Sequence, residues 1–233
     1  MTQFFEENYK EIFQYWLPPT SIKNLSVLDL GSKEGRLGEY CLSNGAKDYI
    51  GVEINSKKVL QAQERFPQIK FYNEDLTDFV KRCVHKYTFF DFVVLTRTLH
   101  YIQDQIELLE NISKITNNII IESGVPVDRP LLDLVNDFKT IRKDAEFYNY
   151  ILQIQEHMEY EENFTLHFFN KESIQNVPSI GFLKSVFDQL EFESDLTIYE
   201  KLKQIYPSEY GFFYKNRKDD LLGKFVVKFK RVK

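Results

Sequence analysis

The chain has 233 residues, of which 43% are hydrophobic, so it can bury the core of one sizeable domain and is not an intrinsically disordered protein. The net charge is -5 and the pI is about 5.5, which disfavours broad electrostatic binding to nucleic acid or anionic membranes. No run of 18 apolar residues occurs, so no membrane-spanning helix is predicted.

The compartment is predicted from the cysteines and the N-terminus. Cys41 and Cys83 have neither the spacing of a zinc site nor that of a disulfide framework, which fits a reducing environment. The first residues carry acidic side chains and lack an apolar run with a cleavage site. We therefore expect a cytoplasmic protein.

The first half of the chain alternates between strand and helix patterns. Apolar spacing predicts a helix over 3–16, which ends before Pro18-Pro19 and makes 1–19 an N-terminal covering segment. Strands are predicted at 26–30, 49–53, 69–72, 89–95 and 118–122, and helices at 35–44, from Ser56 as the cap, at 76–85 and through 102–112. This alternation predicts a doubly wound α/β sheet with parallel strands.

The rhythm changes after Gly124. Residues 125–170 contain two helical patterns without a clear strand between them, and we interpret them as a helical insertion after the fifth strand. A helix from about Lys171, a strand over 190–196, a Tyr- and Phe-rich connection and a final strand over 224–231 follow.

The turn after the first strand is where an open α/β sheet binds its ligand. A nicotinamide or flavin fingerprint needs glycines at positions 31, 33 and 36, but Lys33 and Arg36 occupy two of them. The glycines can also serve the turn alone. Glu53 follows Gly35 by 18 residues, close to the distance at which such folds place a carboxylate for ribose hydroxyls.

Four segments in order resemble the motifs of the class I S-adenosyl-L-methionine-dependent methyltransferase superfamily. They are VLDLGSKEG, GVEIN, FYNEDL and FDFVVLTRTLHYI, and the resemblance covers residues 26–123. It implies one Rossmann-like domain spanning 1–233, with a seven-stranded, mostly parallel sheet in the order 3-2-1-4-5-7-6 whose last strand is antiparallel. It also implies S-adenosyl-L-methionine as cofactor.

The resemblance assigns roles to individual residues. Asp29, Gly31, Ser32 and Gly35 match the turn around the methionine moiety, and Thr96 matches a position whose backbone lies close to it. Glu53 matches the ribose carboxylate, Asp75 the residue that meets the adenine amino group, and Ile54 and Leu76 the walls beside the adenine ring. Lys33 departs from the family pattern. Its side chain can pair with the methionine carboxylate or point to solvent, and the sequence leaves both open.

Candidate catalytic residues follow strands four and five. His100 and Glu122 are candidate proton acceptors, and Tyr101 and Arg97 are candidate acceptor-binding groups; helix capping or packing is the alternative role. His157 and His167 with Glu156 and Glu122 lack the tight spacing of a metal site, so no metal is predicted.

The acceptor class is bounded by missing motifs. The chain has no Pro-Cys nucleophile and no Asn/Asp-Pro-Pro-Tyr/Phe after strand four, which excludes cytosine C5 and DNA amino-methyltransferases. The acidic and aromatic residues of the insertion, 125–170, which the resemblance makes an acceptor lid, favour a small molecule or saccharide. An RNA methyltransferase for tRNA or RNA ends, a nucleotide- or nicotinamide-dependent enzyme and a catalytically silent cofactor-binding or scaffold protein remain as alternatives.

Overall fold

A seven-stranded sheet organises the chain. The computed structural model describes residues 3–124, 165–169, 174–178, 180–206 and 224–232. The strand order is β3-β2-β1-β4-β5-β9-β8, and β9 alone runs antiparallel to both of its neighbours. The strands are β1 (Ser26–Leu30), β2 (Asp48–Glu53), β3 (Lys70–Asn73), β4 (Phe92–Thr96), β5 (Asn118–Gly124), β8 (Phe192–Asp195) and β9 (Lys224–Arg231). The predicted order 3-2-1-4-5-7-6 is therefore confirmed.

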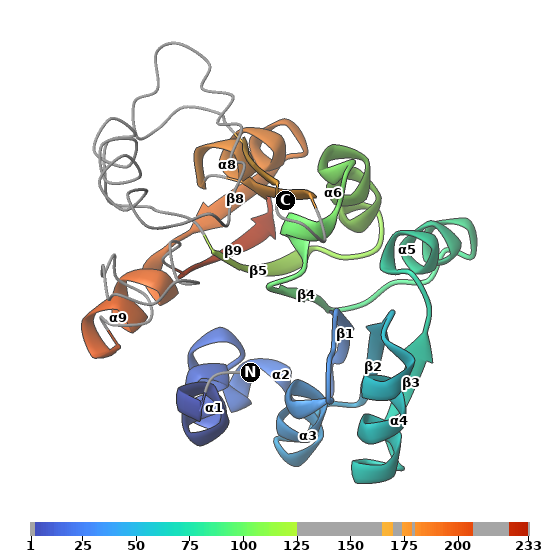
Figure 1. The fold of residues 1–233 in the computed structure, drawn as a ribbon. Helices are drawn as coiled ribbons and strands as arrows, with labels where there is room; N and C mark the ends of the chain where they lie inside the picture. Colours follow the sequence, from blue (N-terminus) through green and yellow to red (C-terminus); the bar gives the residue numbers. More distant parts are fainter. Residues whose placement is uncertain (1–2, 125–164, 170–173, 179, 207–223, 233) are drawn as a thin grey trace, which may run out of the picture.

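Helices cover both faces of this sheet (Figure 1). One face carries α1 (Gln3–Trp16), α3 (Arg36–Ser43), α4 (Ser56–Arg65) and α9 (Thr197–Ile205), and the other carries α5 (Leu76–His85), α6 (Gln105–Ser113) and α8 (Ile180–Gln189). Two short elements, α2 (Pro19–Ile22) and η1 (Leu99–Tyr101), complete the helical set of the described segments. None of the described helices has the length and apolarity needed to cross a membrane.

The N-terminal helix α1 packs against α3 and α9 and lies near the end of β1. Its apolar face buries Ile12, Phe13 and Trp16, with Phe13 packed 5.2 Å from the Trp16 ring and 5.7 Å from the Tyr40 ring of α3. Burial of three large side chains supplies several kcal/mol of transfer free energy, on the order of 1.5–3 kcal/mol for each. Through this packing, α1 brings Phe13 close to the loop that follows β1.

The C-terminal half differs from the prediction in two places. Thr165–Phe169 forms strand β6 and pairs antiparallel with β7 (Ile174–Pro178), so the helix predicted from about Lys171 is wrong and α8 begins only at Ile180. The remainder of the predicted insertion, 125–164 and 170, lies outside the described residues. Helix α9 occupies part of the segment predicted as a connection, because Tyr199 and Leu202, spaced by three residues, are both buried.

Two local details of the first half also differ. Strand β4 begins at Phe92 rather than at Phe89, because Phe89 is 53% exposed and Phe90 forms only an isolated bridge to Thr116. Helix α4 is capped by Asn55 and not by Ser56: the Asn55 side chain accepts hydrogen bonds from the N–H groups of Lys57 and Lys58 at 3.1 and 3.3 Å.

Gly35 is the N-cap of α3 and lies close to Phe71 of β3. Its φ is +78°, in the left-handed region, and a Cβ atom at this position would lie 2.5 Å from Cζ of the buried Phe71. Gly45, after the same helix, has a φ of +84°, but its Cβ would meet only Lys23 Cγ at 3.6 Å. The two glycines therefore share a backbone requirement and differ in packing.

We expect Gly45→Ala to lower the free energy of unfolding by about 1 kcal/mol, the cost of the left-handed conformation. Gly35→Ala should cost about 2–4 kcal/mol, because the collision with Phe71 adds an overpacking penalty. Urea denaturation of both variants measures the difference. Equal losses would contradict the packing role of Gly35.

Candidate functional site

The loop between β1 and α3 is fastened to the end of β2. Gly31, with a φ of +89°, turns the chain at the carboxyl end of β1. The N–H groups of Gly31 and Ser32 donate to Val52 O at 2.8 and 3.0 Å, and the N–H of Lys33 donates to Glu53 Oε2 at 3.1 Å. Three consecutive amides thus fix the loop at the sheet edge where parallel α/β folds bind ligands.

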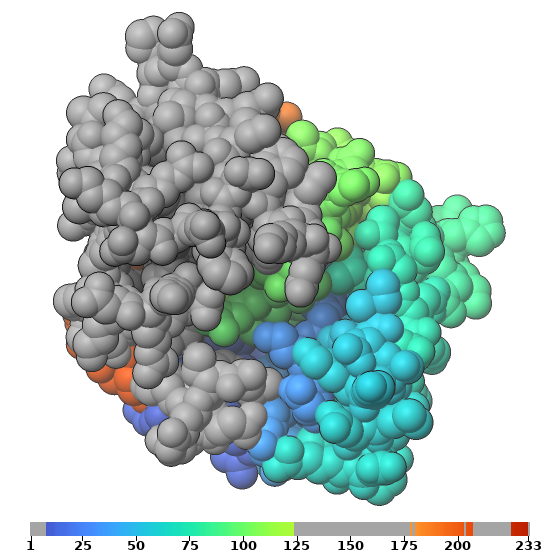
Figure 2. All heavy atoms as spheres, in the orientation of Figure 1, coloured from blue at the N-terminus to red at the C-terminus, as the bar shows by residue number. Residues whose placement is uncertain are grey.

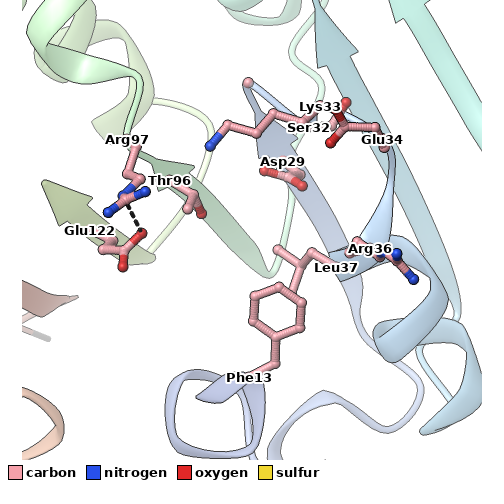
Figure 3. A pocket seen from close by; sticks show the side chains of 11 residues that line it. Phe13, Asp29, Ser32, Lys33, Glu34, Arg36, Leu37, Thr96, Arg97 and Glu122 are labelled. Atoms are coloured by element: carbon pink, nitrogen blue, oxygen red, sulfur yellow. Dashed lines mark ion pairs between the residues drawn. The ribbon is translucent and has the colours of Figure 1, made fainter. Parts of the chain in front are cut away.

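A pocket opens at this edge, between the carboxyl ends of β1, β4 and β5 and the N-terminal helix (Figure 3). Figure 2 shows that on this side of the molecule the blue and cyan surfaces of the first elements adjoin the green surface of later ones. The pocket is lined by Phe13, Asp29, Gly31, Ser32, Lys33, Glu34, Arg36, Leu37, Thr96, Arg97 and Glu122. Six of the predicted site residues therefore come together here: Asp29, Gly31, Ser32, Thr96, Arg97 and Glu122.

Asp29 is a buried acid near the end of β1. It is 3% exposed, Tyr49 Oη donates to its Oδ2 at 2.5 Å, and its Oδ1 has no hydrogen-bond partner among the described residues. Burial raises the pKa of Asp29 to about 7, against the opposing effects of the Tyr49 hydrogen bond and the Lys33 charge. A buried carboxylate oxygen without a partner is costly, and a cationic or donor group of a ligand would satisfy it.

A charged cluster closes the opposite side of the pocket. Arg97, with a φ of +52°, approaches Glu122 Oε2 with its Nε at 3.9 Å and donates its backbone N–H to Glu122 O at 2.8 Å. The Lys33 side chain extends across the pocket toward this pair (Figure 3). Burial, and next the charge of Arg97, lower the pKa of Lys33. Of the two orientations left open for Lys33, the structure has the one that lines the pocket.

His100 and Tyr101 stand on η1, outside the set of residues that line the pocket. Their ring centroids lie 4.1 Å apart, and Tyr101 is 56% exposed. Burial lowers the pKa of His100 to about 4, assisted by the charges of Arg97 and Lys33. His100 is therefore uncharged at neutral pH and is a weaker base than an ordinary histidine.

The ends of β2 and β3 carry the residues predicted for a nucleoside. Glu53 Oε1 accepts from Asn55 N at 2.9 Å, and the Asn73 side chain donates to Glu53 O and Ile54 O at 3.0 and 2.9 Å. Ile54 is 69% exposed, whereas Leu76 is buried and offers little apolar surface. Asp75 caps α5 by accepting from Thr77 N at 2.8 Å and Asp78 N at 3.3 Å, both through Oδ1.

Some pocket residues had no signal in the motifs. Phe13 and Leu37 fall in segments predicted as helices and were not predicted as site residues; their place in the pocket depends on how α1 and α3 pack. Arg36 lies with its guanidinium over the Tyr9 ring, at 5.0 Å from the centroid. Among the described residues no group of three acids, histidines or cysteines could hold a metal, and His157 and Glu156 lie outside them.

A family model matches part of the chain. Residues 28–118 match a family model described as a methyltransferase domain. The sequence has no significant match among curated proteins.

Several solved structures share the fold. An S-adenosylmethionine-dependent methyltransferase from Mesorhizobium loti superposes with a TM-score of 0.58 at 13% identity, covering 96% of this chain and 97% of the other. Magnesium protoporphyrin IX methyltransferase from Synechocystis PCC 6803 with bound SAH gives 0.58 at 12% identity, with coverages of 100% and 89%. The N-terminal domain of EvdMO1 in the presence of SAH and D-fucose gives 0.55 at 13%, with 97% and 82%. At these identities the likeness establishes the fold.

The raised pKa of Asp29 makes stability depend on pH. The folded state keeps a proton that the unfolded state releases between pH 3.8 and about 7, so this group stabilises the fold at low pH and the contribution is lost as the pH rises through that window. We expect the free energy of unfolding of the wild type, relative to Asp29→Asn, to fall by up to about 4 kcal/mol across it. Urea denaturation at several pH values measures the difference.

Tyr49→Phe provides the matched variant. Loss of the Tyr49 hydrogen bond, which stabilises the ionised carboxylate, should move the upper end of the window to higher pH. A difference between wild type and Asp29→Asn that does not change with pH would contradict the assignment.

Proposed function

We propose that this chain is a class I S-adenosylmethionine-dependent methyltransferase and that it transfers the methyl group of S-adenosylmethionine to a small-molecule or saccharide acceptor. The identity of the cofactor is proposed from the pocket beside the loop after β1, which three N–H groups fasten to the end of β2. Asp29 Oδ1 and Ser32 Oγ, both buried and without a hydrogen-bond partner, lie in it. These residues fit the polar amino-acid end of the cofactor.

The cofactor residues divide into two groups along the sheet edge. Asp29, Gly31, Ser32, Gly35 and Thr96 are proposed to surround the methionine moiety at the ends of β1 and β4. The loop amides already orient Glu53, whose remaining lone pairs are proposed to accept the ribose hydroxyls.

The adenine ring is proposed to lie against the exposed Ile54. The buried Leu76 would form a wall of the adenine site. The Asp75 oxygen that does not cap α5 would accept a hydrogen bond from the amino group of the adenine ring. This arrangement assigns the apolar surface at the end of β2 to the base of the cofactor.

When bound, S-adenosylmethionine supplies a methyl group on a sulfonium, which is transferred by in-line displacement. The protein then contributes mainly by positioning donor and acceptor and by taking up a proton from a hydroxyl or amine acceptor. We propose that His100 or Glu122 takes up that proton and that Tyr101 holds the acceptor. Glu122 is 1% exposed and paired with Arg97, whereas His100 is uncharged at neutral pH and therefore free to accept.

The acceptor class is proposed from charge. A net charge of -5 disfavours a polyanionic acceptor such as RNA. Two proteins with this fold support a small acceptor. One is named as a magnesium protoporphyrin IX methyltransferase, and the structure of the other was obtained in the presence of SAH and D-fucose. The buried thiols of Cys41 and Cys83 are free, which favours a cytoplasmic location for the reaction.

The cofactor proposal is tested by ligand-dependent stabilisation. S-adenosylhomocysteine at about 100 times its Kd should stabilise the fold by roughly 2.7 kcal/mol and so raise the Tm, whereas NAD and ATP should not. Thermal unfolding with each ligand measures this. A larger shift with NAD, or none with S-adenosylhomocysteine, would overturn the proposal.

The role of His100 is tested by a kinetic and stability comparison. His100→Ala should lower turnover by about 100-fold or more and leave the affinity for S-adenosylhomocysteine within about threefold, since general-base contributions are typically that large. If His100 is the base, the acid limb of the wild-type kcat profile should lie near pH 4, following its lowered pKa.

His85→Ala, at an exposed position at the end of α5, is the control and should leave both quantities unchanged. Normal turnover per folded molecule in His100→Ala, accompanied by a loss of stability, would assign His100 to packing and leave Glu122 and Tyr101 as the candidates.

A further inference from the structure

Lys33 occupies an unusual place in the loop after β1. Its φ is +48°, in the left-handed region that glycine adopts without strain and that a lysine adopts only when its surroundings hold it there. The hydrogen bond from its N–H to Glu53 Oε2 provides part of that hold. The backbone therefore places a long cationic side chain where the neighbouring turn positions are glycines.

The Lys33 side chain lies in the pocket rather than in solvent. It crosses from the end of β1 toward Arg97 and Thr96 (Figure 3), and its charge interacts with those of Arg97 and Glu122. Glu122 is already the ion-pair partner of Arg97, and none of the ion pairs within the described segments involves Lys33. Two cations thus converge on one buried acid, which leaves the ammonium group of Lys33 available to an anion.

Asp29 supplies the complementary charge on the same wall of the pocket. Its Oδ2 accepts the hydrogen bond from Tyr49, while its buried Oδ1 has no hydrogen-bond partner within the part of the chain that the structure describes. The pocket therefore offers an unpaired ammonium and an unpartnered carboxylate oxygen together. This pair of groups is complementary to a zwitterion, and an α-amino acid presents one carboxylate and one ammonium on adjacent atoms.

We propose that Lys33 binds the carboxylate of the cofactor's amino-acid end, while Asp29 binds the neighbouring ammonium. The inference rests on the proposed function, since it names a subsite for the same cofactor. It makes Lys33 a positioning residue: holding the carboxylate fixes the chain that leads to the sulfur atom. The methyl acceptor is not part of this contact, so the proposed role of Lys33 does not depend on the class of the acceptor.

The test compares two ligands that differ only in the carboxylate. Calorimetry would measure the affinity of S-adenosylhomocysteine and of decarboxylated S-adenosylhomocysteine for the wild type and for Lys33→Gln. We expect the wild type to favour the carboxylated ligand by about 10–100-fold, the scale of a charge-assisted hydrogen bond. In Lys33→Gln this preference should nearly vanish, with the affinity for the decarboxylated ligand within about twofold of the wild-type value.

Lys58→Gln is the matched control, because Lys58 is close enough to Lys33 for their charges to interact but does not line the pocket. It should keep the preference for the carboxylated ligand. Circular dichroism and the Tm of each variant check that the fold is intact.

The remaining outcomes distinguish failure of the Lys33 proposal from failure of the proposed function. Equal weakening of both ligands in Lys33→Gln, or tighter binding of both because an obstructing side chain has been shortened, would overturn the role of Lys33. A preference for the carboxylated ligand that persists in Lys33→Gln would overturn it as well. Failure of the wild type to bind either ligand would overturn the proposed function itself.

Discussion

Three consecutive backbone N–H groups, those of Gly31, Ser32 and Lys33, donate to the end of β2, and the rest of the site depends on them. They hold the loop after β1 in left-handed turns at Gly31 and Lys33, and the Lys33 N–H orients the Glu53 carboxylate from one side. With the loop fixed, Lys33 reaches into the pocket and Asp29 stays buried beneath it. The hydrogen bonds from Gly31 and Ser32 join backbone to backbone and cost no side-chain entropy, so they suit a site that must be preorganised.

Much of the fold could be predicted because parallel strands that are buried on both faces have distinctive sequences. Val93, Val94 and Leu95 are completely buried, and their apolar run identified β4 without any periodicity. The β6–β7 hairpin was missed because a run of five residues is too short to separate strand from helix. Helix α9 was not predicted because the sequence between the last two predicted strands is typical of a Tyr- and Phe-rich connection, although Tyr199 and Leu202 have helical spacing.

In the candidate site, too, some features could be predicted from the local sequence, whereas others depend on tertiary packing. The position of Asp29 and Glu53 at one edge of the sheet could be predicted, because each ends or nearly ends a recognisable strand and strand ends of a parallel sheet converge on one edge. The direction of Lys33 could not be predicted, since it depends on a φ of +48° that only the folded loop imposes. The burial that lowers the pKa of His100 to about 4 likewise arises from packing around η1, so its weak basicity has no counterpart in the motif.

We propose that this pocket serves methyl transfer to a small acceptor. The decisive experiment incubates the protein with methyl-labelled S-adenosylmethionine and a fractionated cell extract, with Asp29→Asn as the impaired control. We expect label in the small-molecule or saccharide fraction, strongly reduced for the variant. Label in RNA or protein, or no transfer by a wild type that binds the cofactor, would contradict it.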